Sequence, residues 1–460
     1  MSLSSVLLMS GNAIKGLQLF AALSILIVLH EFGHYFFARL FKTRVEKFYL
    51  FFDFLFPFSG LLNFSLFKKQ KGDTLYGIGW FPLGGYVKIS GMIDESMDKE
   101  ALAKPAEEWE YRSKKPYQRL FIMLGGIIVN VLLAIVLYVV VFCAYGEEYL
   151  PVNNAVYGIA VDSIGKSIGL ENGDMIHSID NMPIDRFDHI PKRIFYSKNQ
   201  TGTIQLTRNG KDITVNIPKG TVAKMSKLKK GGFISFGMPP VADTIIPKTI
   251  AEKEHMLKGD SIISVNGQTI KYLSEFNEIK IATFGTPISI VFMRNNALDS
   301  VRLTIPKDSL LGFQPLAAKH LRFEKIHYGL FSGIGRGFTY TYEQFIDYVT
   351  QFGLIFTSKE IKVNESVGGI ISFGQIFPST FDLELFIRLL AFISIILAFM
   401  NLLPIPGLDG GYVLFLLFEM ITGKAVSEKV MERATTVGLV LLLTAMVYFN
   451  GLDIFKLFRH

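Results

Sequence analysis

Long apolar stretches divide the chain into membrane-spanning and water-exposed parts. They cover residues 17–40, 120–145, 389–418 and 434–452. A helix of about 20 apolar residues crosses the hydrocarbon core of a bilayer, so each stretch is long enough to span it. Two prolines and two glycines interrupt the third stretch at 401–410, and irregular backbone at that depth is tolerated only where it is buried in protein or lines a cavity. The pattern predicts a multi-pass α-helical membrane protein with four spans.

A segment rich in glycine and aromatic residues lies between the first two spans. Residues 76–89 read YGIGWFPLGGYVKI, and glycine is too frequent there for a helix. An ordinary surface loop would expose many of these aromatic side chains to water. The segment therefore predicts a membrane-associated β-hairpin that contains Gly77, Gly79, Gly84 and Gly85.

The region between the second and third spans contains an internal repeat. Gly173-Asp174 and the short isoleucine-rich strand after it recur 86 residues later, at Gly259-Asp260. Arg208-Asn209 recurs at the same offset as Arg294-Asn295. Such a repeat predicts two copies of one α+β unit, at 155–220 and 232–308, rather than two unrelated small β domains. The Gly-Asp-strand pattern resembles the core of bacterial PDZ domains.

The remaining segments complete the expected organisation. Residues 1–154 would hold the first two spans with the β region, and 381–460 the last two. Residues 320–380 would form a juxtamembrane amphipathic segment, because 328–357 alternates aromatic and polar residues at helical spacing. A substrate clamp and a simple connector helix explain that segment equally well.

Charge adds an orientation to this picture. Half of the residues are hydrophobic and 19% are charged, with a net charge of +7. Much of the basic excess flanks spans, so no nucleic acid is needed to explain it. Lys and Arg concentrate at both ends of 41–119, which predicts that this part is cytoplasmic and that 146–385 lies outside. The single cysteine, Cys143, excludes an intrachain disulfide.

The first apolar stretch carries the candidate chemistry. It contains His30-Glu31-Phe32-Gly33-His34. Histidines four residues apart share one face of a helix and can bind one Zn²⁺, while Glu31 can act as a general base. Ionisable groups at membrane depth are costly and usually functional. We therefore expect a hydrolytic metal centre inside the membrane.

A third ligand is needed, because catalytic zinc usually has three protein ligands and a water. The other six histidines lie outside the predicted spans; they are His177, His189, His255, His320, His327 and His460. Asp409 is the sole acidic residue inside the third apolar region. Its carboxylate is the natural third ligand. A helix cap at the break is the alternative role for Asp409.

The HEFGH motif, the Asn401…Pro404…Leu408-Asp409-Gly410 motif and the tandem PDZ-like repeats together resemble the site-2 protease family, in particular its bacterial RseP-type members. The resemblance covers nearly the whole chain. It implies zinc bound by His30, His34 and Asp409, with Glu31 as catalytic base and Asn401 bonded to the substrate backbone. The glycines at 77, 79, 84 and 85 would belong to a β-hairpin that pairs with an extended substrate. Gly125-Gly126 with Asn130 resembles the glycine-rich opening of the family's second span.

The resemblance also implies partners and a location. Substrates would be transmembrane segments of single-span proteins, such as anti-sigma factors or signal-peptide remnants, cleaved in the bacterial inner membrane. The PDZ-like units would lie outside the cytoplasm and could bind peptide termini.

Three other functions fit parts of the pattern. A metal transporter could use His30, His34 and Asp409 as a relay, but it would need neither Glu31 nor the repeats. A catalytically inactive scaffold should have lost a ligand, and none is lost. A zinc peptidase for soluble substrates is disfavoured because the motif lies in a span.

Overall fold

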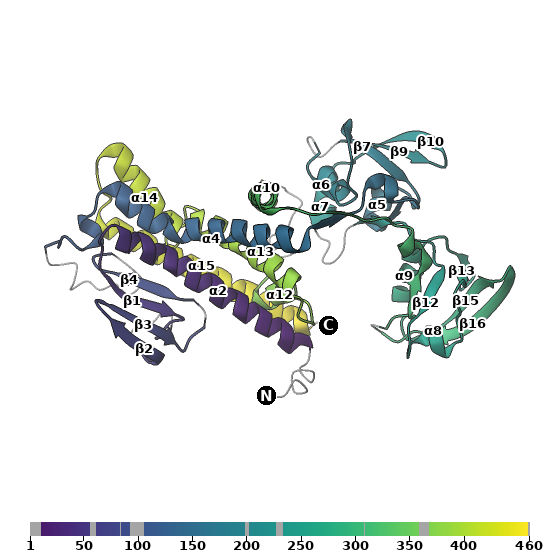
Figure 1. Ribbon diagram of the computed structural model, residues 1–460, viewed down its shortest axis with the longest axis horizontal. Helices are drawn as coiled ribbons and strands as arrows, with labels where there is room; N and C mark the ends of the chain where they lie inside the picture. The colour runs from purple at the N-terminus through teal and green to yellow at the C-terminus, as the bar shows by residue number, and fades with distance from the viewer. Residues whose placement is uncertain are drawn as a thin grey trace. The chain divides into compact units, whose positions relative to one another are not determined.

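The computed structural model describes residues 11–55, 61–82, 84–92, 105–197, 202–226, 233–307, 309–357 and 368–458. The chain forms two compact units. One extends to Gly146 and resumes at His327, and the other contains Glu147–Ile326. Each is described separately below (Figure 1).

Among the described residues of the first unit, four helices are long and apolar enough to cross a membrane, which confirms the four predicted spans. They are α2 (Gly11–Leu40), α4 (Pro116–Tyr145), α13 (Leu383–Leu402) and α15 (Glu428–Phe458). The predicted break is also present, since the backbone leaves the helix after Leu402 and α14 begins at Asp409 (Asp409–Thr422). Shorter or surface helices complete the unit: η1 (Tyr111–Ser113), α10 (Leu330–Thr357) and α12 (Ile370–Gly374).

Helix α4 is the centre of this bundle and packs against α2, α10, α13 and α14. It approaches α2 so closely that a Cβ atom on Gly33 would collide with the backbone of Gly125 and Gly126. The Asn130 carbonyl also accepts a 2.8 Å hydrogen bond from Ser394 Oγ of α13. Helix α4 therefore packs against both the first and the third span, which also contact each other.

A four-stranded sheet follows α2. Its strands are β1 (Val45–Leu50), β2 (Ser65–Lys71), β3 (Thr74–Gly79) and β4 (Tyr86–Ile89), in the order β2-β3-β1-β4. Strands β2 and β3 form an antiparallel hairpin, whereas β3 runs parallel to β1. The expectation of one hairpin within 76–89 is therefore wrong in detail, because β1 lies between β3 and β4.

The second unit contains the same fold twice. The first copy has the sheet β10-β9-β7-β8 with the pair β11-β6, and the second has β14-β13-β15-β16 with the pair β12-β17. The first copy comprises β6 (Ile159–Val161), α5 (Ser163–Ile168), β7 (Met175–Ile179), β8 (Met182–Pro183), α6 (His189–Phe195), β9 (Thr203–Arg208), β10 (Lys211–Asn216), α7 (Thr221–Ser226) and β11 (Ile234–Phe236). The second comprises β12 (Ala242–Ile245), α8 (Ile250–Lys253), β13 (Ser261–Val265), β14 (Gln268–Thr269), α9 (Leu273–Ala282), β15 (Pro287–Arg294), β16 (Ala297–Thr304), β17 (Phe313–Pro315) and η4 (Leu316–Lys319). Strands β5 (Glu147–Tyr149) and β18 (Glu324–Ile326) pair where the chain enters and leaves the unit, and η2 (Val152–Asn154) follows β5.

Strand pairing moves the expected domain boundaries. Ile234–Phe236 pairs with β6, and Phe233 is buried in the first core, so the first copy extends beyond residue 220. The second copy begins near β12 and closes with β17, beyond residue 308. The sequence alone could not reveal this, because each closing strand pairs with the first strand of its copy across a long stretch of chain.

A buried ion pair explains why Gly-Asp and Arg-Asn recur together. Arg208 donates to both oxygens of Asp174, at 2.7 and 2.8 Å, and Arg294 bonds Asp260 at 2.8 and 2.7 Å. Both aspartates are fully buried. Burial by itself would raise the pKa of Asp260, but hydrogen bonds from Arg294 and the Leu257 N–H hold it below its usual value. The repeat therefore keeps one structural ion pair in each copy, Asp174–Arg208 and Asp260–Arg294, which we call the Asp–Arg lock.

Candidate metal centre

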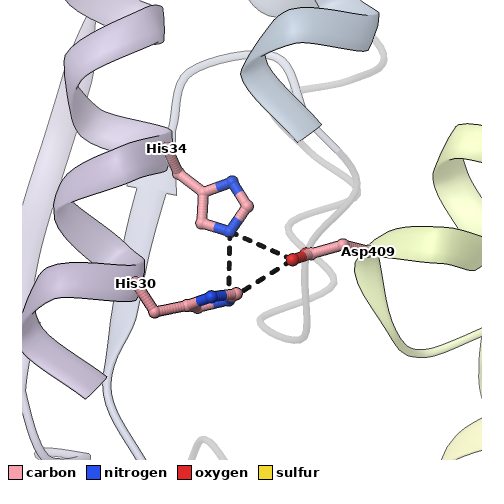
Figure 2. Close-up of side chains that lie close together, drawn as sticks. All are labelled: His30, His34 and Asp409. Atoms are coloured by element: carbon pink, nitrogen blue, oxygen red, sulfur yellow. Dashed lines mark hydrogen bonds and ion pairs between the residues drawn. The ribbon is translucent and has the colours of Figure 1, made fainter. Parts of the chain in front are cut away.

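Three candidate ligands from two distant parts of the chain meet in the first unit. His30 and His34 lie one turn apart on α2, and Asp409 is the first residue of α14 (Figure 2). His30 Nε2 and His34 Nε2 are 3.3 Å apart, and each is 3.3 Å from Asp409 Oδ2. The N-cap of α14 is Leu408, and no side chain caps the helix. The geometry therefore does not favour a capping role for Asp409.

The three donor atoms fit a zinc ion. Zinc binds nitrogen and oxygen ligands at about 2.0–2.1 Å in a tetrahedron, so neighbouring ligand atoms stand about 3.3–3.4 Å apart. The observed triangle has three edges of 3.3 Å. Two imidazoles and a carboxylate are a donor set that zinc accepts, and the fourth tetrahedral position would remain for water or substrate.

Both histidines are oriented by contacts at Nδ1. His34 Nδ1 lies 2.8 Å from the Ile122 carbonyl oxygen, an acceptor, so its proton belongs on Nδ1 and Nε2 is free to bind metal. His30 Nδ1 lies 3.2 Å from the side-chain amide of Asn130, which is fully buried. Asn401, at the end of α13, brings its amide within 3.4 Å of His30 Nε2.

A cavity of about 250 Å³ opens beside these ligands. Its lining includes the three ligands, Glu31, Asn401, strand β4 and residues of α14 and α15. Glu31 projects from α2 toward β4, where the Val87 backbone contributes a hydrogen bond. The carboxylate therefore shares the cavity with the candidate ligands without belonging to their triangle.

The four glycines expected to bind substrate occupy two different places. Gly77 and Gly79 lie in β3, which is paired on both sides, so their strand offers no free edge. A Cβ atom there would collide with the Tyr49 ring or the Phe52 backbone. Close packing against neighbouring strands explains both glycines without a substrate, so their contact with an extended substrate stays a prediction.

Gly84 and Gly85 precede β4, which among the described strands has a neighbour on one side only. A Cβ atom on Gly85 would lie 2.7 Å from Tyr49 O and 3.6 Å from Glu31 Cγ. Gly85 therefore sits where the edge strand passes the cavity, whereas a Cβ atom on Gly84 would meet the Phe52 ring at 2.6 Å.

Two contributions to the site escaped the sequence analysis. A Cβ atom on Gly126 would lie 2.5 Å from His30 Nδ1 and 2.7 Å from His34 Nε2, so the glycine makes room for both imidazoles. Thr435 of α15 lines the cavity, is buried, and its hydroxyl has no partner among the described residues. The sequence indicates Gly126 only through the family resemblance, and nothing in the local sequence distinguishes Thr435 from the neighbouring Thr436.

Comparison with known proteins agrees with this geometry. The family model of peptidase family M50 matches residues 18–445. Protease RseP of Yersinia pestis is 28% identical over 458 residues, covering 95% of this chain and 96% of the relative. The regulator of sigma-E protease RseP of Escherichia coli is 27% identical, with the same coverage. A Neisseria meningitidis protein named as a zinc metalloprotease is 27% identical, and the match covers 93% of this chain and 96% of the relative.

These matches confirm the resemblance to site-2 proteases and are consistent with Zn²⁺ as the cofactor. They set aside the transporter and the inactive scaffold, since both the family and the relatives are peptidases. The match includes the candidate ligands, Glu31, the whole of α4 and α13, most of α2 and the first part of α15. The chain belongs to peptidase family M50 and is a membrane metalloprotease of the site-2 type.

Proposed function

We propose that this protein cleaves transmembrane segments of single-span proteins within the bilayer, in regulated intramembrane proteolysis. His30, His34 and Asp409 hold the zinc ion, and Glu31 is the catalytic base. One observation carries the proposal: three donor atoms with 3.3 Å edges stand between helices long and apolar enough to span a membrane. The same cavity contains a carboxylate outside the ligand triangle, Glu31, which a purely structural metal site would not need.

The chain's own residues account for the proton transfers. Zinc in such a site acts as a Lewis acid that favours ionised water at neutral pH and polarises a carbonyl. Glu31 takes a proton from the attacking water and delivers it to the amine of the broken C–N bond. The Asn401 amide, beside His30, hydrogen-bonds the substrate backbone near the scissile bond.

Cleavage requires that the substrate helix unwinds, because a helix keeps its carbonyl oxygens in internal hydrogen bonds. Strand β4 supports this step, since Tyr86, Val87 and Ile89 line the cavity and the strand is an edge of its sheet. An unwound segment would align with β4 by β-strand addition. Gly84 and Gly85 keep side chains out of the approach to that strand.

The first test is cleavage in a defined membrane. Wild type and Glu31→Gln protein are reconstituted in liposomes with a single-span protein, and the products are mapped by mass spectrometry. We expect wild type to cut within the apolar segment and Glu31→Gln to leave it intact. Cutting only outside that segment, or equal cutting by both proteins, would contradict the proposal.

We also propose an orientation, with residues 41–119 in the cytoplasm of a bacterial inner membrane and the repeats outside. The distribution of Lys and Arg around the spans supports it. A reporter fused near Lys211 should read extracytoplasmic and one near Lys114 cytoplasmic. The reverse pattern would exchange the side from which substrates are presented.

The two repeats are PDZ-like modules that filter substrates by size, and their grooves are candidate sites for peptide termini. Their Asp–Arg locks and separate cores support rigid, independently packed bodies. The described residues of the repeats contain no cluster of metal-ligating side chains like the one in the spans. A substrate with a folded external domain should be cut more slowly than the same span without it, and equal rates would refute the filter.

A further inference from the structure

The contact between Asn130 and His30 has a consequence for the metal centre. Asn130 lies on α4, its side chain is fully buried, and its Nδ2 atom is 3.2 Å from His30 Nδ1. Its Oδ1 atom is buried and has no hydrogen-bond partner among the described residues. A buried amide oxygen without a partner costs about 1–3 kcal/mol, so such an arrangement needs an explanation.

Histidine tautomers make this amide orientation incompatible with metal binding. If Nδ2 donates to Nδ1, the neutral His30 ring carries its proton on Nε2. Nε2 is the atom that faces Asp409 Oδ2 and His34 Nε2, and a metal ligand must be unprotonated. A metal-binding His30 needs its proton on Nδ1 and an acceptor facing it.

We infer that, in the zinc-bound enzyme, Asn130 turns its Oδ1 toward His30 Nδ1 and thereby fixes the metal-binding tautomer. Asn130 is a positioning residue in this scheme, and the inference rests on the proposed zinc site. Among the described residues, Oδ1 has no partner and Nδ2 contacts His30, so the rotation breaks no other side-chain hydrogen bond there. It leaves Nδ2 at the position without a partner, and what it gains is a His30 tautomer whose Nε2 can bind metal. Oxygen and nitrogen of an amide have nearly the same shape, so the surrounding packing is unaffected.

The partner histidine supports this assignment independently. His34 Nδ1 already faces a carbonyl oxygen, that of Ile122, at 2.8 Å. With Asn130 Oδ1 turned inward, both imidazoles would donate from Nδ1 to an amide-type oxygen on α4 and present Nε2 to the metal. Helix α4 would then provide the second layer of contacts for both ligands.

Two nearly isosteric substitutions separate an acceptor from a donor at position 130. Asn130→Asp keeps an oxygen that can accept from Nδ1, and Asn130→Leu has no polar atom. Partners of this kind are worth about 10- to 100-fold in metal affinity. In a Glu31→Gln background, with affinity read by competition with a zinc chelator, Asn130→Leu should bind zinc 10- to 100-fold more weakly. Asn130→Asp should keep or improve the parent affinity.

Ser394→Ala is the matched control. It removes the 2.8 Å hydrogen bond to the Asn130 main-chain oxygen without touching the amide, and should leave zinc affinity within about twofold. If Asn130→Asp binds as weakly as Asn130→Leu, or Asn130→Leu binds like the parent, the inference is wrong. If the Glu31→Gln parent itself binds no zinc, the proposed metal centre fails instead.

One measurement needs no substitution at position 130. In ¹⁵N-histidine NMR of the zinc-loaded Glu31→Gln protein, both zinc-bound imidazoles should be protonated at Nδ1. A zinc-bound histidine protonated at Nε2 would overturn the inference even if the position 130 variants fail to fold.

Discussion

Gly126 offers a strong perturbation of the metal centre that replaces none of the candidate ligands. A methyl group at this position would lie 2.5 Å from His30 Nδ1 and 2.7 Å from His34 Nε2. Ordinary van der Waals contact begins near 3.4 Å, so both rings would have to move by about 0.7–0.9 Å, several times the ±0.2 Å tolerated in metal sites. The backbone of α4 cannot yield, because Gly125 is already packed against Gly33.

We therefore expect Gly126→Ala to weaken zinc binding by about 100-fold and to lower the cleavage rate by at least as much, since misplacing reacting groups by ~1 Å costs about 10²-fold. Zinc affinity is measured by chelator competition in the Glu31→Gln background, and cleavage in liposomes with Glu31 intact. Gly126→Ala protein that is folded yet binds zinc like its parent would refute the geometric argument.

Gly16→Ala in α2 is the matched control for this substitution. Apart from the backbone of its own helix and its chain neighbours, no atom of the described residues lies within 4 Å of the Cβ position at Gly16. Glycine inside a helix is less favourable than alanine by about 0.5–1 kcal/mol, so this variant should be at least as stable as wild type. Its zinc affinity and cleavage rate should be unchanged.

Three further outcomes are expected. Glu31→Gln should abolish cleavage and retain one zinc per chain by elemental analysis, because Glu31 is outside the ligand triangle. The Thr435 hydroxyl lines the cavity without a partner among the described residues and can bond a bound substrate, so Thr435→Val should lower kcat/KM about 3- to 10-fold without changing zinc affinity, as loss of one such hydrogen bond worth about 1 kcal/mol predicts. Thr436 has an exposed hydroxyl that bonds its own helix, and Thr436→Val should have no effect. Because the folded-state pKa of Asp260 lies below its usual value of about 4, its ion pair with Arg294 stabilises the second repeat above that pH and is lost as the pH falls further. Hydrogen exchange in that repeat should therefore accelerate below about pH 4 in wild type and lose this pH dependence in Asp260→Asn.

The bilayer and the helix period explain which features the sequence could predict. The four spans and the break near Pro404 could be predicted because backbone N–H and C=O groups inside a bilayer must form hydrogen bonds within the protein. His30 and His34 share a helix face because they are four residues apart. Asp409 could be predicted as a ligand because so few carboxylates occur at membrane depth. The two repeats could be predicted because the Asp and Arg residues of their ion pairs keep the same spacing.

Pairing between distant segments accounts for what the sequence missed. The parallel neighbour of β3 is β1, and this depends on contacts across a segment of chain that has no regular pattern. The closing strand at Ile234–Phe236 pairs with β6 and so falls outside the expected boundary of the first repeat. Thr435 reaches the cavity only because α15 packs on the broken third region, where a Cβ atom on Gly438 would collide with Pro406 O.

Zinc-edge X-ray absorption of the Glu31→Gln protein, compared with the same protein carrying Asp409→Ala, tests the central claim most directly. The parent should show two imidazole nitrogens and an oxygen shell at about 2.0–2.1 Å, with one zinc per chain. Asp409→Ala should lose most of its zinc under the same conditions. A zinc-loaded Asp409→Ala protein with an unchanged spectrum, or a parent spectrum without imidazole, would contradict a metal centre built from His30, His34 and Asp409.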